Sequence, residues 1–251
     1  MGAQMTWRRS HGVAATQHRS GGTSQSTNRP DTAGGFNPTL QPQQAMNYEI
    51  GARGVVDGRL TWSAAIYQAN VNDELISYSV PSSPQRRFFR NAGSARHRGV
   101  ELGAEVTLFT GVSVAGTYTV SDFRYRNYAV PGYDLHGRPL PGIPRYAGRV
   151  ELHAQPALAR GGWVEVETQH SSGYFVNDTL AVRTTPWWAT NLRLGWDGTA
   201  GGMRLAPFVG INNLFRRLYV GSVVINAAGG RYYEPAPGCS VYIGLSLGAA
   251  R

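Results

Sequence analysis

The chain has 251 residues, of which 41% are hydrophobic and 16% charged, and its formal net charge is +9 at pH 7. No apolar run reaches the roughly 20 residues of a membrane-spanning helix, and the single cysteine, Cys239, excludes an intrachain disulfide and a cysteine-rich zinc site. The arginines are scattered rather than gathered on one element, so the positive charge alone does not favour a nucleic-acid partner.

The first 35 residues differ in composition from the rest of the chain. Residues 1–35 are rich in Ser, Thr, Gly, Gln and Arg without periodicity, and we expect an irregular or disordered segment there. The start also lacks the apolar stretch of a signal peptide, so none is expected in this chain. Residues 36–251 form the second predicted unit.

Apolar and polar residues alternate through most of this second unit. The alternation is clearest between Arg98 and Asp122, on both sides of a short turn at 109–111. A period of two indicates β-strands, because successive side chains leave opposite faces of the pleat. Nine strands are predicted, at 48–56, 59–77, 98–108, 112–122, 145–154, 163–170, 187–197 and 203–219 and in a last segment that ends in VYIGLSLGAAR.

The connections between these strands alternate in length. Short turns, such as Asp57-Gly58, follow the first, third, fifth and seventh strands, and long connections follow the others. Transmembrane barrels have short periplasmic turns, longer extracellular loops and strands of about ten residues. Charged residues also favour one parity of each strand, as required where the other face meets hydrocarbon. We therefore predict an all-β, antiparallel transmembrane β-barrel, with a soluble β protein as the alternative.

Three segments carry recognisable motifs, NPTLQPQ followed by NYEIG, NAGSA followed by RGVEL, and NNLFRRLY followed by RYYEPAPG. Their characteristic residues are Asn37, Pro38, Leu40, Pro42, Tyr48, Glu49, Gly51, Gly99, Glu101, Asn213, Leu214, Phe215, Tyr219, Arg231, Tyr232, Pro235 and Pro237. In this order and spacing they resemble signatures of TonB-dependent outer-membrane receptors of the ferric-siderophore type. Gln43 stands where the family usually has Glu.

The resemblance implies a location and a set of partners. Such receptors have a barrel of 22 strands closed by a plug domain, so this chain would correspond to about nine strands without the plug. The implied function is energy-coupled uptake of a ferric siderophore or similar scarce nutrient through the bacterial outer membrane. The implied partners are that ligand, outer-membrane lipid and lipopolysaccharide, the barrel-assembly machinery and, only through the missing plug, the TonB complex.

The missing plug and signal peptide suggest a fragment of a receptor gene. Two other interpretations stay open. One is a smaller passive outer-membrane pore completed by oligomerisation, and the other is a basic β protein that binds nucleic acid. The six histidines include no HxxxH or HExxH pattern, and we predict no enzyme, no metal site and no cofactor.

Ligand contacts are expected in the long loops. Two clusters combine basic and aromatic residues, and their members are Arg86, Arg87, Phe88, Phe89 and Arg90 in the first and Tyr125, Arg126, Tyr128 and Tyr133 in the second. Arginine pairs with carboxylates and phosphates, and aromatic faces stack on planar ligands, so both clusters suit an anionic ferric chelate. The alternative is an interfacial aromatic girdle with arginines at anionic lipid head groups, for which Trp187 and Trp188 are also candidates.

Overall fold

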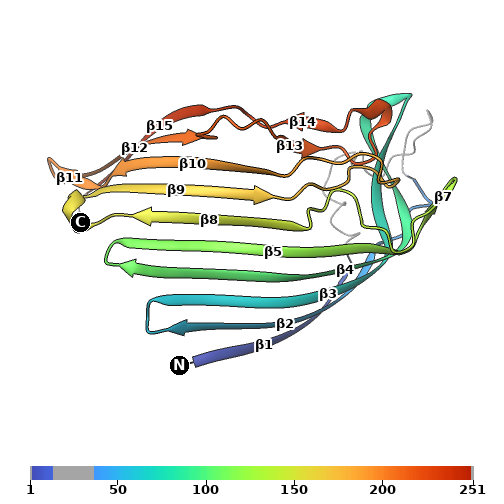
Figure 1. Cartoon of the computed structure of the whole chain (residues 1–251), viewed down its shortest axis with the longest axis horizontal. Helices are drawn as coiled ribbons and strands as arrows, with labels where there is room; N and C mark the ends of the chain where they lie inside the picture. The colour runs from blue at the N-terminus through green and yellow to red at the C-terminus, as the bar shows by residue number, and fades with distance from the viewer. Residues whose placement is uncertain (1, 14–36, 250–251) are drawn as a thin grey trace.

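The computed structural model describes residues 2–13 and 37–249, and its main feature is a single antiparallel sheet of eleven strands (Figure 1). Neighbours along the sheet follow the order β1-β2-β3-β4-β5-β8-β9-β10-β12-β11, and β15 also pairs with β12. The strands are β1 Gly2–Val13, β2 Gln44–Val56, β3 Leu60–Val80, β4 Ser83–Phe109, β5 Val112–Asn127, β8 Tyr146–Ala154, β9 Gly162–Ser171, β10 Trp187–Trp196, β11 Gly198–Ala200, β12 Met203–Asn212 and β15 Ser240–Ala249.

Small elements lie in the connections. Two short hairpins form outside the main sheet, and two 3-10 turns complete the set, at β6 Ala129–Val130, β7 Tyr133–Asp134, β13 Val220–Val223, β14 Tyr233–Pro235, η3 Ala157–Ala159 and η4 Ala228–Gly230. The predicted all-β antiparallel fold is confirmed. Within residues 2–13 and 37–249, no helix is long and apolar enough to cross a membrane.

Three sequence predictions differ from the structure. Gly2–Val13, expected to be irregular, forms β1 and pairs with β2 along its whole length, while 14–36 lie outside the described residues. The backbone hydrogen bonds of a strand do not require alternating side chains, which is why the pattern missed it. The division of the chain at residue 35 stays a prediction. The eighth predicted strand ends at Asn212 rather than Tyr219, because Asn213 has a positive φ of 51°.

The third difference concerns the connection VPSSPQRRFF, which was expected to be a long loop. Instead, β3 and β4 continue through it as one long hairpin that turns at Pro81 and Ser82. In Figure 1 this hairpin rises at the end of the sheet opposite the short turns, beside the segment that joins β13 and β14. Ser79 donates its backbone N–H to the Asn226 carbonyl, so residues almost 150 positions apart lie side by side.

All the long connections gather at one end of the sheet (Figure 1). This loop end contains the tip of the β3–β4 hairpin and residues 128–145, 172–186 and 213–239. The opposite turn end contains the short connections at 57–59, 110–111, 155–161 and 197–202. The predicted alternation of short and long connections is therefore present as two different ends of one sheet.

The sheet has one apolar and one polar face. Cross-strand registers place Ile66, Val100 and Val120 on the same face, and the alternation carries this face through every long strand from β2 to β15. Its large side chains include Ile50, Ile66, Leu102, Tyr118, Val150, Leu152, Leu194, Val241, Ile243, Leu245 and Leu247. The polar face carries Glu49, Arg53, Glu101, Glu105, Arg149, Glu151, Glu165, Glu167 and Arg193.

The apolar face is open to its surroundings. Ile66 is 59% exposed, Val150 55% and Ile243 83%. Along β4 the face runs from Val100 to Leu108, which is about 27 Å at the usual rise per residue. With the strand tilt of about 40° usual in barrels, that length covers about 20 Å, close to the hydrocarbon band of outer-membrane barrels. An apolar surface this extended is typical of contact with lipid rather than water.

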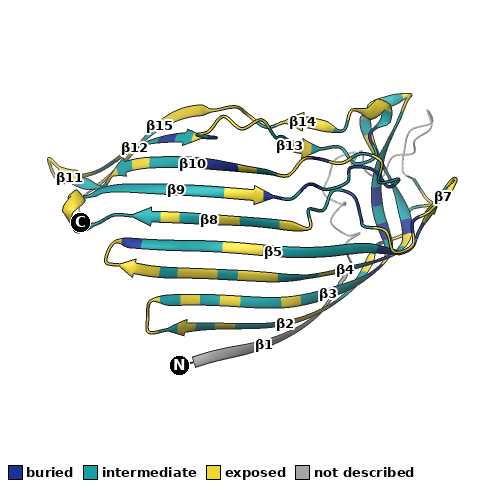
Figure 2. Cartoon of the chain, viewed as in Figure 1, coloured by how far each residue is buried: buried dark blue, intermediate teal, exposed yellow. Residues whose placement is uncertain are grey.

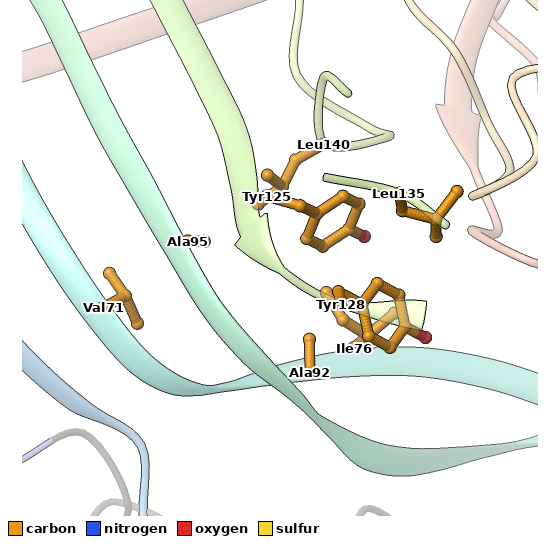
Figure 3. Close-up of a cluster of buried hydrophobic side chains, with 8 residues drawn as sticks. All are labelled: Val71, Ile76, Ala92, Ala95, Tyr125, Tyr128, Leu135 and Leu140. Carbon is orange, nitrogen blue, oxygen red and sulfur yellow. The ribbon is translucent and has the colours of Figure 1, made fainter. Parts of the chain in front are cut away.

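A buried hydrophobic cluster lies at the loop end, where Figure 2 shows dark segments on the hairpin and the long connections. Figure 3 shows its eight side chains, which are Val71, Ile76, Ala92, Ala95, Tyr125, Tyr128, Leu135 and Leu140. Val71, Ala95 and Tyr125 are register partners with the parity of the polar face, so the cluster forms on that side of the sheet. The loop end thus has a core of its own.

Candidate ligand-binding region at the loop end

A buried carboxylate, Asp178, joins four separate parts of the loop end. Only 4% of its side chain is exposed. Its oxygens accept hydrogen bonds from the hydroxyls of Tyr125 (2.9 Å) and Tyr128 (3.2 Å), from the Arg90 guanidinium (3.2 Å) and from the Asn226 side-chain amide (3.0 Å). We call these five residues the Asp178 network. A buried charge with this many donors is stabilised in place, because each donor replaces lost hydration.

Asn226 extends this network to the β3–β4 hairpin. Its side-chain oxygen accepts from the backbone N–H of Asp178 (2.9 Å), and its amide also donates to the Ser77 carbonyl (3.2 Å). The backbone N–H of Asn226 donates to the carbonyl of Val176, which is fully buried. Asn226 has a positive φ of 52°, a conformation that Asn tolerates better than most residues. The connections 172–186 and 224–232 are therefore fixed to the hairpin by one amide side chain.

The two tyrosines of the network are held in the protonated form. Burial, and then the neighbouring Asp178 carboxylate, raise the pKa of the Tyr128 hydroxyl to about 12. The same two causes raise the pKa of Tyr125 further. Both hydroxyls consequently remain hydrogen-bond donors to Asp178 at any physiological pH.

The predicted ligand-contact residues divide into buried and accessible groups. Phe88 and Tyr125 are each 1% exposed, and Tyr128 is 7% exposed. Arg90 donates to Asp178 and stacks over the Tyr78 and Tyr128 rings, so these residues build the loop-end core. The accessible group lies around this core and consists of Arg86, Arg87, Phe89, Arg126 and Tyr133. Both predicted clusters are thus brought to the loop end, but they do not form one surface.

The motif residues hold backbone turns and close approaches. The side chain of Asn37 accepts from Thr39 in a local turn. Asn213 binds the Arg217 and Pro237 carbonyls, which fixes the irregular segment after β12. A Cβ at Gly99 would lie 2.5 Å from the Tyr67 hydroxyl and the Val120 carbonyl, so a side chain does not fit there. These contacts give the motif segments structural roles.

The other motif residues lie in the same parts of the chain. Leu40, Pro42 and Tyr48 belong to the stretch that leads into β2 and to β2 itself, whereas Leu214 and Phe215 follow β12. The Tyr219 ring stacks on Trp187 at 4.3 Å between centroids. The last motif flanks or forms β14, with Arg231 and Tyr232 before it, Pro235 at its end and Pro237 after it. Pro38 lies in the turn that Asn37 closes.

The polar face carries a ladder of ion pairs. Arg193 lies opposite Glu165 in the register and donates to it at 3.0 Å. Arg149 pairs with Glu151 and, at 2.7 Å, with Glu167. These charges lie on the face opposite the exposed Ile and Leu side chains, so they avoid the hydrocarbon layer that a charge enters only at high cost.

The residues most important for the loop end were not found from the sequence. Asp178 and Asn226 stand in connections without periodicity, and their partners lie 48 to 149 positions away. A signal for Asn226 existed, since Asn followed by small residues and Gly-Gly is typical of a tight turn. Within the described ranges, no group of three or more His, Cys, Asp or Glu side chains is placed to hold a metal ion.

Comparison with known proteins gives matches over most of the chain. The family model described as "TonB dependent receptor-like, beta-barrel" matches residues 7–214. The ferrioxamine B receptor of Salmonella typhimurium is 26% identical over 188 residues, which is 72% of this chain and 25% of that protein. The ferrichrome outer membrane transporter and phage receptor of Escherichia coli is 31% identical over 86 residues, or 34% of this chain and 11% of that protein. The chain thus spans about a quarter of the ferrioxamine B receptor.

Solved structures show the same fold. The siderophore receptor PiuA from Acinetobacter baumannii superposes with a TM-score of 0.69 at 16% identity, covering 98% of this chain and 33% of that one. The copper transporter OprC superposes with a TM-score of 0.65 at 17% identity, covering 85% of this chain and 31% of that one. At this identity the likeness establishes the fold and leaves the ligand open.

The match over residues 7–214 extends from β1 to the first residues after β12, and the predicted family is confirmed. Proteins of this family are receptors and transporters of the bacterial outer membrane rather than enzymes. The exposed apolar face and the two unlike ends of the sheet agree with that location. The chain belongs to the TonB-dependent receptor family and forms part of its outer-membrane β-barrel.

Proposed function

We propose that this chain supplies wall and outer loops of a receptor that takes up a ferric siderophore, or a similar scarce chelated nutrient, by energy-coupled transport. The polar face would line the transport path, and the loop end would meet the ligand first. Under this proposal the TonB complex acts through a plug domain, and the barrel-assembly machinery inserts the protein.

The observation that carries the proposal is the Asp178 network. It joins the β3–β4 hairpin, the end of β5 and the connections 172–186 and 224–232 into one ordered body on the polar side of the sheet. A receptor benefits from such order, because a surface that is already arranged loses less entropy when it binds. A passive pore has no comparable need for a fixed outer surface.

Accessible basic and aromatic side chains surround this body. Arg86 lies over the Phe88 ring at 5.4 Å, and Arg87 and Tyr133 are exposed. Guanidinium groups and aromatic faces suit an anionic chelate. The names of two sequence relatives, a ferrioxamine B receptor and a ferrichrome transporter, point to iron chelates as the ligand class.

The test is uptake in cells. We would express the protein from its own gene in a host without its own siderophore receptors and measure accumulation of radioactive iron from ferrioxamine B, ferrichrome and a ferric catecholate, with copper uptake in parallel. The proposal predicts saturable uptake of at least one ferric chelate that stops when the proton gradient is collapsed. Uptake of every chelate without saturation and without energy would contradict it and support the passive pore. Copper accumulation alone would replace the proposed ligand class.

A further inference from the structure

A compact cluster of arginines lies on the apolar face, close to the loop end. Arg96 and Arg98 continue the parity of Val100 and Leu102 along β4, and their register partners on β5 are Arg124 and Asp122. Arg126 reaches the same place, since its guanidinium donates to Asn70, the β3 partner of Arg96. We call Arg96, Arg98, Arg124 and Arg126 the outer arginine cluster.

The cluster carries more positive charge than its surroundings balance. Within the described part of the chain, Asp122 pairs with both Arg98 and Arg124, at 2.7 Å in each case. Arg96 and Arg124 lie directly opposite each other, an arrangement of like charges that destabilises a sheet. Four guanidinium groups beside one carboxylate therefore favour the binding of an added anion.

The arginines are also positioned for binding. The shared carboxylate holds Arg98 and Arg124 side by side, and Arg124 is further fixed by a hydrogen bond to the Gly137 carbonyl at 2.8 Å. Both side chains stay partly open, with 51% of Arg98 and 39% of Arg124 exposed. A planar guanidinium that is oriented in advance suits the oxygen atoms of a phosphate group.

A shallow apolar furrow lies on the same strands, farther from the loop end. It has a volume of about 610 Å³. Two adjacent cross-strand rows line it, and the small side chains of Ala64, Ala104, Gly116 and Gly148 form its floor between Trp62 and Tyr118. Arg98 and Leu102 are four residues apart on β4, so about 13 Å separates the charged cluster from the furrow.

These two features fit one molecule with a charged head and an apolar tail. We propose that the face formed by β3, β4 and β5 binds an outer-leaflet lipid with two phosphates on its headgroup. The outer arginine cluster holds the phosphates, and one acyl chain lies in the furrow. Each phosphate monoester carries about −1.5 to −2 charges at pH 7, so two match the three unbalanced arginines better than one does. The cluster stands where the apolar face ends, at the depth of lipid headgroups.

This proposal depends on the outer-membrane location and not on the transported ligand. The outer arginine cluster faces away from the polar side of the sheet, so its loss should leave iron uptake nearly unchanged. A failure of lipid binding and a failure of uptake are therefore separate results.

The experiment measures lipid that stays bound to the full 251-residue chain. The chain is reconstituted in phosphatidylcholine bilayers with diphosphoryl lipid A, monophosphoryl lipid A or phosphatidylglycerol, extracted in mild detergent and analysed by native mass spectrometry. We expect retention of diphosphoryl lipid A at least several-fold above that of the other two. Equal retention of all three lipids would overturn the proposal, as would displacement of the lipid by millimolar inorganic phosphate.

Variants locate the site. The triple change Arg96→Gln, Arg98→Gln and Arg124→Gln should reduce retention of diphosphoryl lipid A at least tenfold. The control Arg204→Gln, on the polar face near the turn end, should leave it unchanged. Ala104→Trp, which fills the furrow from an exposed position, should reduce retention several-fold. Unchanged retention in the triple variant would contradict the assignment.

A milder pair of variants covers the case in which the triple variant does not insert. Arg98→Gln alone should weaken retention several-fold, and Arg98→Lys should weaken it less, because lysine keeps the charge but loses the fork of donors. Equal retention in the wild type, Arg98→Gln and Arg98→Lys would overturn the proposed role of the cluster.

Discussion

The membrane belt and the loop end of this sheet follow opposite rules of burial. In the belt, large apolar side chains such as Ile243 and Ile66 are exposed, and the charges pair with each other on the other face. At the loop end, Phe88 and Leu135 are buried, and a carboxylate is buried with them. The same strands run through both regions. The difference teaches that the surrounding medium, hydrocarbon in one place and water in the other, decides which side chains are turned outward.

The largest effect is expected from removing the carboxylate of the loop end. Asp178→Ala leaves two buried tyrosine hydroxyls and the Asn226 amide without their acceptor, and we expect a local loss on the order of 3–5 kcal/mol. Hydrogen exchange should rise in 172–186 and 224–232 while the belt strands keep their protection. Asp134→Asn, at an exposed carboxylate, is the control. Unchanged exchange in the Asp178 variant would show that the network does not hold the loops.

A charge placed on the apolar face tests the belt. Leu102→Arg should destabilise the protein by about 2–4 kcal/mol in a lipid bilayer, because the guanidinium would face hydrocarbon. Thr117→Arg places the same side chain on the polar face of the neighbouring strand and should cost much less. Unfolding by denaturant in vesicles gives both values. Equal costs for the two variants would mean that the faces do not differ in their surroundings.

Alkaline pH should loosen the loop end alone. The pKa of Tyr128 is raised to about 12 in the folded protein from an ordinary value near 10. A raised folded pKa gives stability that is complete below about pH 10 and is lost as the pH rises toward 12, here about 1–2 kcal/mol. Absorbance of tyrosinate, recorded together with loop hydrogen exchange, checks this. Loosening that begins near neutral pH would require another titrating group.

The smallest effect is expected on the polar face. Arg193→Gln removes an ion pair with Glu165 in which the arginine side chain is 42% exposed. Pairs open to water contribute little, so we expect a loss below about 1 kcal/mol. Thermal unfolding of the variant beside Arg204→Gln, which removes a longer contact to Asp197, provides the measurement. A loss of several kcal/mol would show that the polar face is shielded from water.

The sequence predicted the belt far better than the loop end. Alternation in segments such as Val100 to Leu108 depends only on neighbours along one strand, so the strands, their faces and the fold class followed from it. Motifs such as NPTLQP and NNLF then indicated the family, whose confirmation removes the basis for a nucleic-acid partner.

The loop end was not predictable in this way. Asp178 acts through Arg90, 88 positions away, and no local pattern marks such a contact. The β3–β4 hairpin was missed because Pro81, Ser82 and Pro84 resemble a loop, although a tight turn between long strands accommodates them. β1 was missed because its side chains show no alternation. Contacts distant in sequence require the folded chain to be seen.

The most direct test asks which medium each face meets. Single cysteines at Leu102 and Thr117, introduced after Cys239→Ser, would carry a fluorescent label in reconstituted bilayers. We predict that a quencher dissolved in the lipid acts mainly on the label at position 102, and that a water-soluble quencher acts mainly on the label at position 117. Strong quenching of both labels by the water-soluble agent would contradict the account of this sheet as the wall of an outer-membrane barrel.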